Sequence, residues 1–115
     1  MVNGLIAEAY EQRNGVNTKR MTLEVHGKKA HAGVNPQEGA NAVVELAHKI
    51  QALKELSTNF SGVNITPVAI KGGTVKNVVP DEAMVVFDIE SQDGRQIGEI
   101  ESALRLLFKM NTIAA

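Results

Sequence analysis

The order of strand and helix patterns predicts an α+β fold, a two-layer ferredoxin-like sandwich. From residue 21 onward the chain carries a strand, a helix, two strands and a second helix, which is that layout without its last strand. We expect an antiparallel sheet of about four strands with two helices on one face. Residues 4–11 could fold back across the turn at Asn14-Gly15 and supply the missing edge strand.

The first strand is predicted at residues 21–26, where Met21, Leu23 and Val25 alternate with polar residues. A period of two is typical of a half-buried strand. Residues 5–10 are apolar enough for either a strand or a short helix, and they end near a strong turn signal.

A helix is predicted from Pro36 to about residue 56. Asn35 has the side chain of an N-cap, Pro36 suits the first helical position, and Glu38 suits the third. An apolar stripe at helical spacing follows, made of Val43, Leu46, Ala47, Ile50 and Leu53. The charged side chains between them are expected to face water: Glu45, Lys49 and Lys54.

Residues 62–70 predict a strand at a sheet edge or with a bulge, because Pro67 cannot donate to a ladder. Residues 82–90 predict an inner strand, since apolar residues occupy both of its faces. A second helix is predicted after Asp93, on a stripe made of Ile97, Ile100, Leu104 and Leu107. The 115 residues, 1–115, are expected to form one domain with one core.

Composition excludes several classes of function. The net charge is −1, and the only aromatic residues are three Phe and one Tyr, so a nucleic-acid surface is not expected. The absence of cysteine removes disulfides, thiolate chemistry and cysteine-type zinc sites. No apolar run reaches the roughly 20 residues that span a membrane, and no signal peptide opens the chain, so a cytoplasmic protein is expected.

The two motifs "GKKAHAGVNPQEGANAV" and, about 35 residues later, "GGTVKNVVPDEAMVVFDI" carry a resemblance. Together they resemble the dimerisation, or lid, domain of the zinc-dependent metallopeptidase family of aminoacylases, carboxypeptidase G, peptidase T-like tripeptidases and succinyl-diaminopimelate desuccinylases. The resemblance covers residues 20–108. In that family the domain is inserted into a catalytic domain that holds two zinc ions. The resemblance therefore implies a fragment that is inactive alone, binds no metal itself and lacks its catalytic domain.

The resemblance also implies roles for two residues. His31, between two small alanines, would reach across a dimer and donate a hydrogen bond to the scissile carbonyl oxygen in the partner's active site. Asn77 would bind substrate near the same carbonyl, although asparagine also serves simply to turn a chain. Gly27 and Gly33 are expected to adopt backbone conformations that other residues avoid. His26 and His48 are expected to be surface residues.

Further expectations concern partners and substrate. The family implies a homodimer through strand 62–70 and helix 36–56, with a peptide-like or N-acyl amino acid substrate in the full-length enzyme. One departure stands at Glu90, where many relatives have an arginine that binds the substrate carboxylate. Glu90 leaves open a cationic substrate, a shifted alignment with Arg95 as the substitute, or a member that no longer hydrolyses anything.

Two other functions remain open at this point. The chain could be a purely structural homodimerisation module in which His31 and Asn77 are idle. It could also be a free-standing ferredoxin-like domain that binds a small ligand.

Overall fold

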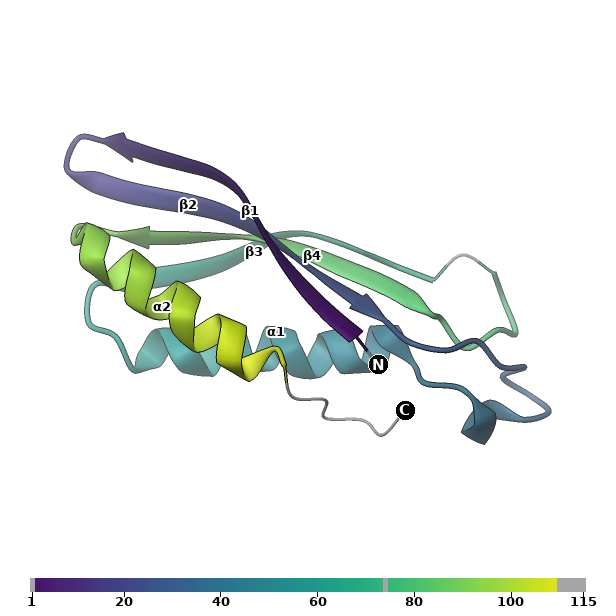
Figure 1. Cartoon of the computed structure of the whole chain (residues 1–115). Helices are drawn as coiled ribbons and strands as arrows, with labels where there is room; N and C mark the ends of the chain where they lie inside the picture. Colours follow the sequence, from purple (N-terminus) through teal and green to yellow (C-terminus); the bar gives the residue numbers. More distant parts are fainter. Residues whose placement is uncertain (1, 74, 110–115) are drawn as a thin grey trace.

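The computed structural model describes residues 2–73 and 75–109, and it contains a four-stranded antiparallel sheet with two helices on one face (Figure 1). The strands lie in the order β1-β2-β4-β3. Their bounds are β1 (Val2–Arg13), β2 (Val16–His26), β3 (Val63–Gly72) and β4 (Glu82–Ser91). The helices are α1 (Ala42–Thr58) and α2 (Gly94–Leu107), with a short 3-10 helix at Pro36–Glu38. The predicted ferredoxin-like sandwich is confirmed.

The first two strands form a tight hairpin. Arg13 lies opposite Val16, and the two residues between them have positive φ angles, 53° at Asn14 and 77° at Gly15. Positive φ at both central positions is the geometry of a type I′ turn, which matches the twist of a hairpin and favours Asn-Gly. Residues 4–11 therefore do fold back beside β2, as a strand and not as a helix.

Pro67 has the position that its chemistry requires. In the described part of the chain β3 pairs only with β4, so it is an edge strand, and the register shifts between Pro67 and Ala69. The edge strand and the bulge are both confirmed. The inner position of β4, between β2 and β3, is confirmed as well.

The hydrophobic core lies between the sheet and the two helices. Side chains of β2 and β4 that point toward the helices are fully buried against the helical stripes. The main members are Met21, Leu23, Val25, Leu46, Leu53, Val85, Phe87, Ile89, Ile97, Ile100 and Leu104. Within residues 2–73 and 75–109, no helix is both long and apolar enough to cross a membrane.

The first long helix begins at Ala42, so the predicted start at Pro36 is wrong. Asn41 is the N-cap, and its Oδ1 accepts from the backbone N–H groups of Val43 and Val44 at 3.0 and 3.1 Å. Pro36–Glu38 forms only a 3-10 turn. The helix cannot run through this region because Ala40 makes two backbone hydrogen bonds with Lys28, each 2.9 Å long.

Two charged side chains of α1 are also placed differently from the prediction. Glu45 and Lys49 are 0% and 3% exposed, and their charged groups lie 3.1 Å apart. Ala47, assigned to the apolar stripe, is exposed. The buried face of the helix is rotated from the predicted one, and Lys49 can lie on it because the charge of Glu45 compensates its own.

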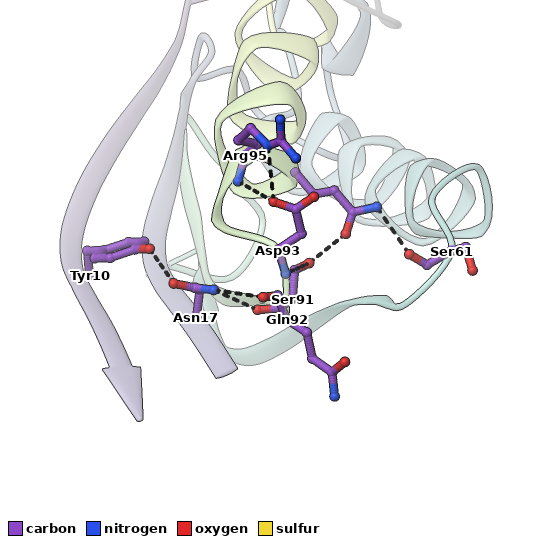
Figure 2. A network of polar contacts seen from close by, with 8 residues as sticks. Tyr10, Asn17, Ser61, Ser91, Gln92, Asp93 and Arg95 are labelled. Atoms are coloured by element: carbon purple, nitrogen blue, oxygen red, sulfur yellow. Dashed lines mark hydrogen bonds and ion pairs between the residues drawn. The ribbon is translucent and has the colours of Figure 1, made fainter. Parts of the chain in front are cut away.

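The second helix follows the prediction and is tied to the hairpin by a polar network (Figure 2). Asp93 Oδ1 accepts from the backbone N–H of Arg95 at 2.9 Å, as an N-cap does. Nearby, Asn17 Nδ2 donates to the carbonyl oxygens of Ser91 and Gln92, and Tyr10 donates its hydroxyl to Asn17 Oδ1. The network joins β1 and β2 to the start of α2.

Candidate functional site

Two connecting segments extend the sheet beyond its strands and past the start of α1 (Figure 1). We call residues 27–32 and 77–81 the paired loops. Their backbone bonds are Gly27 N to Asp81 O (2.7 Å), Val79 N to Ala30 O (2.8 Å) and Ala32 N to Asn77 O (2.8 Å). His31 lies opposite Val78 in an isolated bridge. The pairing brings the backbones around His31 and Asn77 together, although 46 positions separate them in the sequence.

The imidazole ring of His31 is held by its own loop. Its Nδ1 accepts from the backbone N–H groups of Gly33 and Val34, each at 3.1 Å. A ring nitrogen that accepts carries no proton, so the neutral ring has its proton on Nε2. The residue is exposed, and Nε2 makes no hydrogen bond to the parts of the chain that the structure describes. The ring therefore presents a donor to its surroundings.

Asn35 closes the turn that contains His31. Its Oδ1 accepts from the backbone N–H of His31 at 3.0 Å, and its own backbone N–H donates to the carbonyl oxygen of His31 at 3.0 Å. Its Nδ2 donates to Glu38 Oε2 at 2.5 Å. The Asn35 side chain accepts no hydrogen bond from a backbone N–H of the following 3-10 helix, so the predicted side-chain cap is wrong. The residue types that indicated a helix start instead build the His31 turn.

Asn77 turns the chain at the start of the second paired loop. Its φ is 67°, a left-handed conformation that asparagine tolerates better than most residues. Its side chain is exposed and its carbonyl oxygen accepts from Ala32. The turn function considered for it is therefore present, while its role in binding substrate stays a prediction.

Gly27 and Gly33 do not have the positive φ that we expected. Gly33 has room for a side chain, because an added Cβ would lie 3.5 Å from the ring of His31. Gly27 is required for a different reason, since a Cβ there would lie 2.0 Å from the carbonyl oxygen of Ala40. The missing side chain of Gly27 therefore lets its backbone lie against the backbone of Ala40.

A small pocket lies between the paired loops. It has a volume of about 140 Å³, and its lining includes Lys29 from the first loop and Val78 and Asp81 from the second. Small-molecule sites usually have volumes of about 300–1,000 Å³. This pocket is therefore too small to enclose a peptide.

Glu90 lies at the far end of β4 from the paired loops. It lies eight positions after Glu82, the first residue of the strand, which corresponds to roughly 26 Å at the rise of a strand. Arg95, considered as its substitute, lies near the same far end, with Nε 3.6 Å from Asp93 Oδ1. The structure therefore brings neither residue to His31.

Asp88, the acid of the same strand motif, is paired with Arg20 across the sheet. The Arg20 guanidinium donates to both carboxylate oxygens at 2.8 and 3.0 Å. These hydrogen bonds lower the pKa of Asp88, and burial only partly opposes them. Asp88 is therefore engaged within the sheet.

The remaining histidines lie on the surface. His26 is exposed, with Nε2 3.4 Å from Glu24 Oε2, and His48 is exposed on α1. Among the described residues, no group of three or more His, Cys, Asp or Glu side chains could hold a metal ion. The part of the chain that the structure describes therefore contains no ligand cluster of the size that a zinc site needs.

The sequence and the fold are similar to those of known proteins. A family described as "Peptidase dimerisation domain" matches residues 16–112. A Haemophilus influenzae homolog of one p-aminobenzoyl-glutamate hydrolase subunit is 29% identical over 82 residues, which cover 70% of this chain and 19% of that protein. An uncharacterised metallohydrolase of Methanocaldococcus jannaschii is 33% identical over 85 residues, 71% of this chain and 25% of that protein.

Among solved structures, a tripeptidase of Staphylococcus aureus has the same fold, with a TM-score of 0.71 and 25% identity over 81% of this chain and 24% of that one. The chain spans about a fifth to a quarter of the length of the curated relatives that it matches.

Proposed function

Because the chain belongs to the peptidase dimerisation domain family, we propose that it is the dimerisation domain of a zinc-dependent peptidase or amidohydrolase and supplies His31 and Asn77 to the partner's active site. The observation that carries the proposal is that His31 is exposed while its Nδ1 is already hydrogen-bonded within its own turn. Its Nδ1 accepts two backbone hydrogen bonds, which leaves the proton of the neutral ring to Nε2. The exposed residue lies on one of the loops that extend past the start of α1 (Figure 1). A donor in this state suits an oxygen that gains negative charge.

The chemistry follows from that donor. During amide hydrolysis the carbonyl oxygen becomes an oxyanion, and a prepositioned N–H stabilises the transition state more than the ground state. The side-chain amide of Asn77 can both donate and accept, which suits a peptide group of the substrate. We propose a peptide-like or N-acyl amino acid substrate, which the names of the similar hydrolase homolog and tripeptidase support.

In this proposal the catalytic metal ions are bound by another domain and not by this chain. The described residues hold no cluster that could bind a metal ion, while one of the relatives is named a metallohydrolase. We therefore assign the two zinc ions, and the bond-breaking step, to a catalytic domain outside this chain.

The surface proposed for dimerisation is the edge of β3 with the adjoining start of α1. Ile70 lies opposite the core residue Val85, yet it is 65% exposed because no further strand of the described chain covers the edge. Val68 and Val44 add exposed apolar area at 49% and 41%. Two β3 edges can pair antiparallel and continue the sheet. The bulge at Pro67 would concentrate the contact on either side of it.

Mass measurement by light scattering tests the dimer. We expect a twofold mass for the chain, and a monomer for Ile70→Lys, because a charge at the edge cannot be buried in the pairing. Leu106→Lys is the matched control, since Leu106 is 67% exposed but lies on α2. A chain that stays monomeric at high concentration would contradict the proposed interface.

Mixing of variant chains in the full-length enzyme tests the role of His31. We expect His31→Ala to lower kcat by about 10²–10³ with little change in KM, as loss of an oxyanion donor does. His26→Ala, another exposed histidine, should have no such effect. Mixing His31→Ala subunits with subunits that lack a metal ligand should restore part of the activity, because one of the two sites in each mixed dimer is then complete.

The alternative of a purely structural dimerisation module predicts a different result. His31→Ala would then leave kcat unchanged. A mixture that stays inactive although mixed dimers form would contradict the crossing of His31 into the partner's site.

A further inference from the structure

We infer that Asn35, held by Glu38, is a positioning residue that keeps the ring proton of His31 on Nε2. The inference deepens the proposed role of His31, and its significance for catalysis rests on that role. It concerns only contacts within this chain, so it can be tested without the catalytic domain.

The hydrogen bonds of Asn35 fix the turn on both sides. Its side-chain Oδ1 accepts from the backbone N–H of His31, and its backbone N–H donates to the carbonyl oxygen of His31, both at 3.0 Å. The backbone between these two residues is thereby closed into a loop. Gly33 and Val34 lie inside that loop, and their N–H groups point at His31 Nδ1.

Glu38 fixes the orientation of the Asn35 amide. Asn35 Nδ2 donates to Glu38 Oε2, so the amide oxygen is the atom that faces His31. This function requires one acceptor and one donor on the same short side chain, which asparagine has. Aspartate would retain the acceptor but would place a second carboxylate against Glu38, and alanine would remove both bonds.

The turn needs all of these bonds because it is exposed. His31, Gly33 and Val34 are all exposed to solvent, where water competes for each donor. If the turn opens, Nδ1 loses both of its N–H partners, and the ring can rotate or carry its proton on Nδ1. Nε2 would then be an acceptor, which would repel a carbonyl oxygen instead of stabilising it.

Nitrogen NMR of the histidine rings in the 115-residue chain tests the inference directly. With His31 neutral, we expect an unprotonated Nδ1 and a protonated Nε2 in the wild type, and slow hydrogen exchange at the Gly33 and Val34 amides. In Asn35→Ala, both ring signals should move toward the tautomer mixture of free histidine. The two amides should exchange about fivefold faster, as loss of a hydrogen bond predicts.

Three further variants separate positioning from general loss of structure. Asn41→Ala removes a neighbouring asparagine side chain that caps α1, and it should leave the His31 signals unchanged. Glu38→Gln keeps an acceptor for Asn35 Nδ2 and should retain the wild-type signals, whereas Glu38→Ala should shift them. Glu38→Ala also provides the test if Asn35→Ala does not fold.

The outcomes distinguish this inference from the proposed function. Unchanged ring signals and amide exchange in both Asn35→Ala and Glu38→Ala would overturn it. In the full-length enzyme, Asn35→Ala should lower kcat with KM unchanged. This result would support both the positioning role of Asn35 and the oxyanion role of His31. Shifted ring signals with an unchanged kcat would support the positioning by Asn35 but overturn the oxyanion role of His31.

Discussion

Replacing Gly27 by alanine should strongly destabilise the contact between residues 27–28 and Ala40, which lies where the loop that carries His31 leaves β2. The added Cβ would lie 2.0 Å from the carbonyl oxygen of Ala40, whereas real contacts of this kind are essentially never under 3.0 Å. The two backbones must therefore separate by about 1 Å, which breaks the pair of 2.9 Å hydrogen bonds between Lys28 and Ala40. Lost hydrogen bonds contribute about 1 kcal/mol each and overpacking about 1–3 kcal/mol. We expect a total loss of about 3–5 kcal/mol in the free energy of unfolding.

Urea unfolding followed by circular dichroism measures this loss. Gly98→Ala is the matched control, because nothing lies within 4 Å of its added Cβ and the residue is inside α2. That substitution should stabilise the chain by about 0.5–1 kcal/mol, since alanine favours a helix over glycine. A Gly27→Ala chain as stable as the wild type would refute the reasoning, because it would mean that the contact with Ala40 relaxes without cost.

Two other substitutions test charged pairs. Lys49→Met should cost about 3–5 kcal/mol in thermal or urea unfolding, because it leaves the buried carboxylate of Glu45 without its lysine partner; a loss no larger than that of the surface control Lys54→Met would contradict this. Arg20→Gln should lower stability at neutral pH by at most about 1 kcal/mol. Because Arg20 lowers the pKa of Asp88, its contribution is present above the ordinary value of 3.8 and is lost as the pH falls through the lowered pKa. The difference between wild type and Arg20→Gln in urea midpoints should therefore vanish in strong acid, and a difference that grows there would contradict the assignment.

The sequence predicts most of the strands and the second helix because their signals are local. The alternation in β2, the Asn-Gly turn, Pro67 at an edge and Asp93 as a cap each depend on neighbouring residues alone. The predicted start of α1 is wrong because Asn35 and Asn41 both have the side chain of an N-cap. The choice between them is made by the backbone pairing of Ala40 with Lys28, which is a tertiary contact.

For the candidate site, too, the sequence predicts the local features and not those that depend on tertiary contacts. The motifs identify His31 and Asn77 as candidates, but their proximity depends on pairing between loops that lie far apart in the sequence. The proton position on His31 depends on two backbone donors within the turn, which no residue pattern reveals. Burial of Glu45 and Lys49 escapes the pattern because a charged residue at helical spacing normally indicates a face toward water.

The strand order has a consequence for how the chain folds. The two middle strands, β2 and β4, pair Asn17 with Ser91 and His26 with Glu82, which are 74 and 56 positions apart. Local contacts can form the β1–β2 hairpin and α1 early, but β2 has no inner neighbour until β4 has been synthesised. Such non-local pairing slows folding, and the apolar side chains of β2 that belong to the core stay uncovered in the meantime. Substitutions that delay the docking of β4 should therefore reduce the yield of folded chain through aggregation, even when the final structure tolerates them.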